Sequence, residues 1–173
     1  MAALLAGCAT QVPEPIREAP PGNPSPEAVR DAPDALKGER VRWGGTIVSV
    51  TNKADHTEVE IVARPLDSDG EPKAVDRSLG RFLARVPGFV DPAVYAAGRH
   101  VTVTGTVTGV VEQPIGEYSY RFPVVAVDGR YLWPKRQPAA RDRYPYDPFW
   151  YDPWYRRSMF YPYCPYGAPR YCW

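Results

Sequence analysis

The spacing of prolines limits what most of this chain can fold into. Prolines are dense from residue 9 to residue 33 and again after Pro134, where aromatic residues stand between them. A proline ring fixes φ and removes the backbone N–H, so neither stretch is able to form a long helix or a central strand. The folded core is therefore expected in the middle of the chain, between two extended ends.

The middle of the chain has the pattern of β-strands. From His100 to Val111, valine and glycine alternate with threonine, which is the period of two that predicts a strand with one buried face. Shorter runs of the same kind precede and follow it. The expected strands cover residues 41–50, 57–63, 80–86, 100–111 and 118–127, and residues 131–133 close the domain.

Four glycines lie inside these expected strands: Gly44, Gly45, Gly105 and Gly109. Glycine in a strand weakens it unless it marks a bulge or a tight bend. A small closed sheet needs strong twist and corner positions, and these glycines are suited to supply them. Their placement favours a barrel over a flat sheet.

A short helix is expected between the third and fourth strands. Asp91 suits the N-cap, Pro92 the first helical position, and Gly98 the end of a helix that runs to Ala97. Three strands, a helix and two strands form the order of an OB-type barrel. We therefore predict an all-β fold over residues 36–133, a small five- to six-stranded OB-like β-barrel with one short helix; a sandwich of the same strands is the alternative.

The chain opens with an apolar run that ends in Leu-Ala-Gly-Cys at Cys8, which resembles the lipobox of bacterial lipoproteins. In such proteins the signal is cut before the cysteine, which is then acylated, and two or more acyl chains anchor a protein stably. Residues 1–7 carry no Lys or Arg and are short for a signal, so we expect a truncated signal whose true start lies upstream. A frayed terminus with a stray cysteine is the alternative.

Beyond the lipobox, no apolar stretch approaches the roughly 20 residues of a membrane helix, so the chain is expected to be anchored and not to span the membrane. Residues 8–35 are predicted to be a Pro-rich, extended linker that lifts the domain off the bilayer, with a short helical turn at residues 27–31. Ala9 follows the cysteine where inner-membrane lipoproteins typically have aspartate. By that analogy we expect the outer membrane.

Two further cysteines, Cys164 and Cys172, remain once Cys8 carries lipid. An even pair suits an oxidising compartment, and a disulfide between them is one interpretation; two unpaired thiols are the other. A metal site is not expected, because the two histidines, His56 and His100, lie far away in the sequence. No cofactor is expected either.

Residues 134–173 form an extended tail rich in Tyr, Pro and Trp. In one interpretation this tail presents aromatic faces to a partner such as peptidoglycan, another sugar surface or an aromatic-lined protein groove. In the other, it folds back onto the barrel or stays without fixed structure. The candidate interaction residues are Tyr146, Phe149, Trp150, Tyr151, Trp154 and Tyr155.

Several function classes are disfavoured by the sequence. A net charge of +1 offers no field for nucleic acid. The acidic loop 67–71 is similar to a calcium loop but lacks its ligand spacing, and neither histidine has a nucleophile at a suggestive spacing, so we expect no enzyme. Trp43, Tyr118 and Tyr120 are candidates for stacking on an oligosaccharide, although a core position is the favoured interpretation for Trp43.

Five short blocks, in order, resemble the Slp family of starvation-inducible outer-membrane lipoproteins of Gram-negative bacteria. The blocks are Val41-Arg42-Trp43-Gly44-Gly45-Thr46-Ile47, Leu66-Asp67-Ser68, Gly80-Arg81-Phe82, Gly88-Phe89-Val90-Asp91-Pro92 and Val101-Thr102-Val103-Thr104-Gly105-Thr106-Val107-Thr108-Gly109. The resemblance covers residues 36–133 together with the lipobox.

This resemblance implies a non-enzymatic, lipid-anchored envelope protein that faces the periplasm, in a structural role or one related to starvation or the stationary phase. The implied partners are the membrane, through the lipid anchor, and peptidoglycan or an envelope protein. A binding module for peptidoglycan, an oligosaccharide or another small envelope ligand is the alternative.

Overall fold

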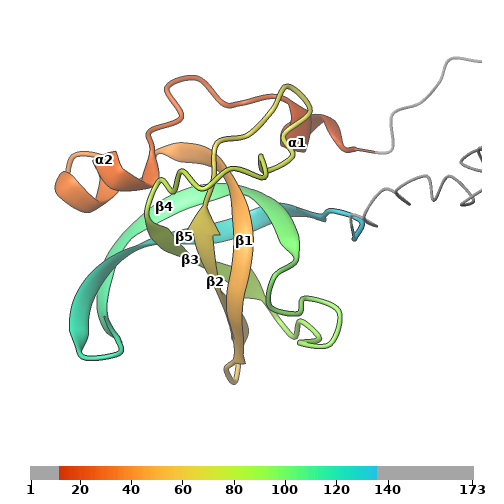
Figure 1. Ribbon diagram of the computed structural model, residues 1–173. Coiled ribbons are helices and arrows are strands. Elements are labelled where there is room, and N and C mark those ends of the chain that lie inside the picture. The colour runs from red at the N-terminus through yellow and green to blue at the C-terminus, as the bar shows by residue number, and fades with distance from the viewer. Residues whose placement is uncertain (1–11, 136–173) are drawn as a thin grey trace, which may run out of the picture. The chain divides into compact units, whose positions relative to one another are not determined.

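The computed structural model describes residues 12–135. Five strands and two short helices follow one another in this part of the chain (Figure 1). The strands agree with the predicted ones to within a few residues at each end. The elements are α1 (Glu14–Arg17), α2 (Pro26–Asp31), β1 (Arg40–Asn52), β2 (His56–Ala63), β3 (Arg81–Pro87), β4 (His100–Ile115) and β5 (Tyr118–Leu132).

The five strands close into a barrel in the order β1-β2-β3-β5-β4, and β4 pairs back onto β1. All neighbouring pairs are antiparallel except β3 and β5, which run parallel where Leu83 pairs with Val124. This is the connectivity of the predicted OB-like barrel. The first strand serves both of its neighbours: its early residues pair with β4 and its later ones with β2.

Glycines permit the sharp coiling of this small barrel. A Cβ on Gly105 would lie 2.1 Å from the carbonyl oxygen of Ala126, and the β4–β5 register shifts beside this glycine and again before Gly109. These shifts agree with the corner positions predicted at Gly105 and Gly109. The bulge expected at Gly44 and Gly45 is wrong, because the β1–β2 register shifts between Ile47 and Ser49 instead. Gly45 has a different role, because a Cβ there would lie 1.9 Å from the Val62 carbonyl oxygen; it allows β1 and β2 to approach closely.

The core lies inside the barrel and follows the period of two. In β2 every second residue from Thr57 to Ala63 is buried, and the residues between are partly exposed. Trp43 of β1 and Phe82 of β3 pack edge to face with ring centroids 5.1 Å apart. Both side chains are buried, so the core interpretation of Trp43 is confirmed.

The predicted helix between β3 and β4 is wrong. Residues 91–97 form turns: the backbone N–H groups of Val94 and Tyr95 donate to the Asp91 carbonyl, and the chain then leaves the helical path. The cause is a contact just before β4, where the Gly98 N–H donates to the carbonyl of Ile47, 2.9 Å away. The connection must reach β1 within a few residues, so one turn is all that forms.

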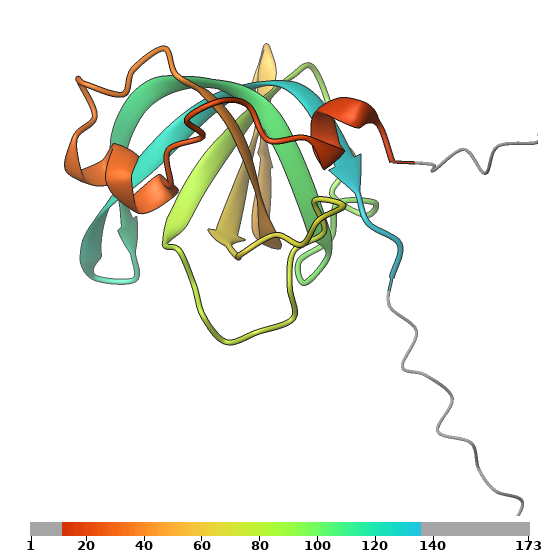
Figure 2. The same ribbon diagram turned by 90° about the horizontal axis from the view of Figure 1, so that it is seen from above.

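The predicted linker, residues 8–35, is corrected from residue 12 onward. Residues 12–33 contain α1 and α2 and pack against the barrel, crossing above it in Figure 2. Ile16 is 1 % exposed, and Val29 belongs to the same core cluster as the strand residues. The short helical turn predicted at residues 27–31 is confirmed as α2, whose N-cap Ser25 accepts the Ala28 N–H at 3.2 Å.

Candidate functional site

The site residues predicted in the two chain ends lie outside the described residues. This applies to Cys8, to the cysteine pair Cys164 and Cys172, and to the aromatic residues of the tail. Their roles therefore stay predictions. Within residues 12–135, a pocket and several side-chain hydrogen bonds lie at the junction between the N-terminal segment, residues 12–33, and the mouth of the barrel.

Side chains of β1 hold the N-terminal segment at this junction. The Arg42 guanidinium donates to the carbonyl of Ile16 at 3.0 Å and also to that of Arg17. The Trp43 Nε1–H donates to the Pro24 carbonyl at 2.8 Å. Prolines lack an N–H but keep their carbonyl, so a proline-rich segment is able to dock by accepting hydrogen bonds from the barrel.

A further hydrogen bond satisfies a backbone N–H at the edge of β1. β1 pairs with β2 only from Gly45 onward, so the Arg42 backbone N–H lacks a strand partner on that side. It donates instead to Asn23 Oδ1, 2.8 Å away. Asn23 has a φ of 34° in the left-handed region, which asparagine tolerates better than most residues. This geometry lets its amide take the place of a strand carbonyl.

Burial lowers the pKa of Arg42 because the charged guanidinium loses water, and the nearby Asp67 carboxylate opposes that shift. The guanidinium is still the charged form at any ordinary pH. Its Nε is buried and has no hydrogen-bond partner among the described residues. Arg42 therefore acts as a fixed donor to the N-terminal segment.

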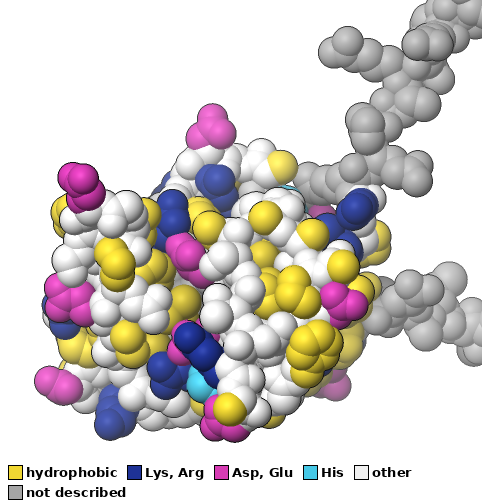
Figure 3. Space-filling model, turned by 90° about the horizontal axis from the view of Figure 1, so that it is seen from below, with side chains coloured by type: hydrophobic (Ala, Val, Ile, Leu, Met, Phe, Trp, Pro, Cys, Tyr) yellow, Lys and Arg dark blue, Asp and Glu magenta, His cyan; other side chains and the backbone are white. Residues whose placement is uncertain are grey.

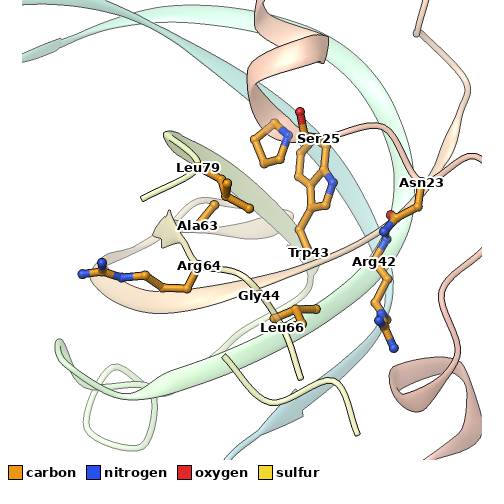
Figure 4. Close-up of a pocket in the computed structure, with 10 residues that line it drawn as sticks. Asn23, Ser25, Arg42, Trp43, Gly44, Ala63, Arg64, Leu66 and Leu79 are labelled. Atoms are coloured by element: carbon orange, nitrogen blue, oxygen red, sulfur yellow. Dashed lines mark hydrogen bonds between the residues drawn. The ribbon is translucent and has the colours of Figure 1, made fainter. Parts of the chain in front are cut away.

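The segment and the barrel enclose a pocket of about 290 Å³. Its lining is mixed: Figure 4 shows the apolar side chains of Ala63, Leu79, Leu66 and Trp43, together with the polar residues Asn23 and Ser25. The guanidinium groups of Arg42 and Arg64 point away from this interior. The pocket is small for an organic ligand. The pocket was not predicted from the sequence, because the residues that form it come from four separate segments.

The other candidate stacking residues have separate environments. The Tyr120 hydroxyl accepts from Arg30 Nη1 at 2.9 Å and from the Arg81 backbone N–H at 3.0 Å, so this ring ties α2 to β5 and the start of β3. Tyr118 is 71 % exposed at the start of β5. The structure thus does not bring Trp43, Tyr118 and Tyr120 together into one stacking surface.

The residues weighed for catalysis and metal binding have structural partners. His56 Nδ1 lies 2.7 Å from Asp55 Oδ1. In the acidic loop, Asp67 Oδ1 accepts the backbone N–H groups of Asp69 and Glu71 and so closes the turn. No group of three His, Cys, Asp or Glu side chains in residues 12–135 is placed to hold a metal ion. His100 begins β4, as its sequence position suggested.

One exposed apolar feature was missed in the sequence. The loop that joins β3 to β4 presents Phe89, 73 % exposed, and Val94, 49 % exposed. The feature was missed because a helix was predicted here. The position of Phe89 directly after the turn residues Pro87-Gly88 was the signal that could have indicated it. Among residues 12–135, no helix has both the length and the apolar character to cross a bilayer.

Comparison with known proteins gives two substantial relatives. The "Uncharacterized lipoprotein YeaY" of Escherichia coli K12 is 39 % identical over 152 residues, covering 87 % of this chain and 77 % of that protein. The "Outer membrane protein Slp" of the same organism is 35 % identical over 162 residues, covering 87 % and 82 %. Both alignments extend well beyond the barrel strands.

Among solved structures, the chain is similar to a small single-stranded DNA-binding protein from Streptomyces coelicolor, with a TM-score of 0.36 and 13 % identity over 59 % of this chain and all of that one. The fold assignment rests on the strand order and not on this similarity. The family model "Outer membrane lipoprotein Slp family" matches residues 5–163. That match spans the lipobox cysteine, the barrel and most of the tail, and the chain therefore belongs to the Slp family of outer membrane lipoproteins.

Proposed function

We propose that this chain is a non-enzymatic envelope lipoprotein, anchored by acylated Cys8 in the outer membrane with its barrel on the periplasmic side. The observation that carries the proposal is the extent of the family match, which begins at residue 5 and so includes the cysteine of the lipobox. Acylation at this position gives an otherwise water-exposed domain a stable hold on a bilayer.

The contacts at the barrel mouth support a structural role. The polar groups there hold the N-terminal segment in place: Arg42 binds carbonyls of α1, and the Trp43 indole binds the Pro24 carbonyl. The segment that leads to the anchor is thereby part of the folded body.

The anchor is tested with Cys8→Ser in the full chain, with Cys164→Ser as the matched control. We expect Cys8→Ser to lose labelling by a fatty-acid probe and to move from the membrane to the soluble fraction, while Cys164→Ser keeps both. Unchanged labelling and sedimentation of Cys8→Ser would overturn the anchor.

A second proposal concerns the tail, residues 134–173. Its alternating aromatic residues and prolines favour contact with peptidoglycan or an envelope protein, because Tyr and Trp give large contact areas at low entropic cost. Co-sedimentation with purified sacculi, comparing the Cys8→Ser chain with the same chain stopped at Gln137, tests it. Tail-dependent pelleting supports a link between membrane and wall; no pelleting of either chain removes the wall as partner and leaves an envelope protein.

The family resemblance also supports a place in the response to starvation or entry into the stationary phase. We expect the amount of protein per cell to rise several-fold when growth stops. Quantitative immunoblotting through a growth curve measures this, and a constant level would contradict the stress-related role while leaving the anchor untouched.

A further inference from the structure

The loop that joins β3 to β4 exposes apolar side chains at its tip. We call residues 88–98 the apolar loop. Phe89 is 73 % exposed and Val94 is 49 % exposed, and Pro92 and Ala93 between them are also exposed. Exposed apolar groups gathered on one loop are unusual in a soluble domain unless they contact something.

The first half of the apolar loop is held rigidly. Thr57 is completely buried, and its Oγ1 lies 2.8 Å from the Gly88 carbonyl oxygen and accepts the Val90 N–H at 3.1 Å. The Gly88 N–H donates to the Asp55 carbonyl at 3.1 Å. Val90 enters the core. Phe89 therefore stands between two fixed residues, and its ring is held outward by the fold.

The second half of the apolar loop is tied to the end of β5. Arg99 donates to the Val94 carbonyl at 3.1 Å and to the Trp133 carbonyl at 2.8 Å. Arg130 Nε donates to the Tyr95 hydroxyl at 3.1 Å. The apolar loop thus lies beside the point at which the chain leaves the barrel.

The first described helix of the chain, α1, lies on the same side of the molecule. In Figures 1 and 2, α1, the end of the described chain at Lys135 and the loop between β3 and β4 are all on one side of the barrel. Seen from below, hydrophobic side chains are spread over the face, and several of them lie on this side (Figure 3). α1 cannot swing away, because Ile16 is buried and its carbonyl accepts from Arg42.

Chain length then limits how far the barrel is from the bilayer. Cys8 is six residues before Glu14, the first residue of α1, and six extended residues span at most about 20 Å. A domain of this size has a radius of gyration of roughly 13 Å, so the tether is shorter than the diameter of the barrel. α1 is therefore held within about 20 Å of the lipid surface to which Cys8 is attached.

We propose that the apolar loop is a membrane-contact element, in which Phe89 and Val94 enter the interfacial layer of the bilayer that holds the acylated Cys8. The proposal rests on the anchor proposed above. A lipid surface fits because it accepts apolar groups without a shaped groove. The contact gives the barrel one orientation on the membrane instead of free rotation about its tether.

Site-specific photo-crosslinking in cells tests this on the full, lipidated chain. A benzophenone amino acid replaces Phe89, and the matched control carries the same probe at Tyr118, which is 71 % exposed at the β4–β5 turn. In Figures 1 and 2 that turn lies on the opposite side of the barrel. We expect phospholipid adducts at position 89 to exceed those at position 118 by at least several-fold.

Equal lipid labelling at the two positions, or labelling of protein alone at position 89, overturns the proposal; the second result assigns the loop to a protein partner. If the probe at position 89 prevents folding, judged by protease resistance, the probe at Val94 gives the same readout.

Each probe is also combined with Cys8→Ser. If that chain still sediments with membranes, the anchor has failed; if it becomes soluble while lipidated protein labels no lipid, only the membrane contact has failed.

Discussion

The N-terminal segment, residues 12–33, and the β4–β5 hairpin belong to one folded body but are stabilised in different ways. The hairpin is paired along its length from Val101 with Leu132 to Ile115 with Tyr118, with two register shifts. The N-terminal segment has helices of only four and six residues, and helices of that length are unstable alone. Its conformation depends on the barrel beneath it.

The difference teaches how a proline-rich segment is able to fold. Without N–H groups at its prolines, the segment cannot add a strand to the barrel, but its carbonyls remain acceptors. Donors on β1, the Arg42 guanidinium and the Trp43 indole, satisfy three of them. Ile16 and Val29 supply the apolar contacts. The barrel therefore fixes the conformation of the segment, and the segment covers the mouth of the barrel.

The N-terminal segment also affects which residues of β4 are buried. Its alternation predicts one buried face, yet residues 101–105 are all buried. Thr102 is covered because its Oγ1 donates to the Gly70 carbonyl at 2.6 Å, and Gly70 in turn lies against the backbone of Ile16. The outer face of this strand is therefore covered by a loop and by α1.

The largest loss of folding stability is expected from a substitution in the barrel core. Phe82→Ala should lower the free energy of unfolding by about 3–5 kcal/mol, because a fully buried ring is lost and a cavity remains. Urea unfolding of the Cys8→Ser chain measures it, with far- and near-UV signals expected to move together. A loss below about 1 kcal/mol would contradict the assigned core.

A smaller effect is expected in the N-terminal segment. Ile16→Ala should lower the free energy of unfolding by about 2 kcal/mol, near the low end for a buried isoleucine, because the segment is able to detach while the barrel stays folded. Hydrogen exchange should quicken at the Arg42 amide and not in the β4–β5 hairpin. Glu18→Ala, an exposed change in the same segment, is the control and should cost under about 0.5 kcal/mol. Equal loss of protection in the hairpin would show that the segment and the barrel unfold as one unit.

The smallest effect is expected at the exposed β1–β2 turn. A side-chain hydrogen bond with His56, then a backbone hydrogen bond, and then the His56 charge hold the pKa of Asp55 below its ordinary value of 3.8. A carboxylate with a depressed folded pKa stabilises the fold above its unfolded pKa, and this is lost as pH falls through the folded pKa. The melting temperature of Asp55→Asn should therefore lie slightly below that of the parent at neutral pH and converge with it in acid. A constant difference across the pH range would contradict this origin.

The strands were predictable because their signals are local. Alternation from Thr57 to Ala63 predicted β2, and the Ser25-Pro26 pair predicted the start of α2. The helix expected at residues 91–97 failed for a non-local reason. Its capping signals were present, but the following residues had to reach the backbone of Ile47.

The amino-acid sequence by itself determined the number and order of the strands, the glycines at which the barrel coils, and the membership of the family, because each depends on neighbours in the chain. Only the tertiary structure decided that residues 12–33 dock instead of extending, and that Phe89 stands outward. The partners responsible, Arg42 for α1 and Thr57 for the apolar loop, lie more than 20 residues away in sequence. No local pattern records contacts over such separations, and the hydrogen bonds they supply outweigh the local preferences of the segments they hold.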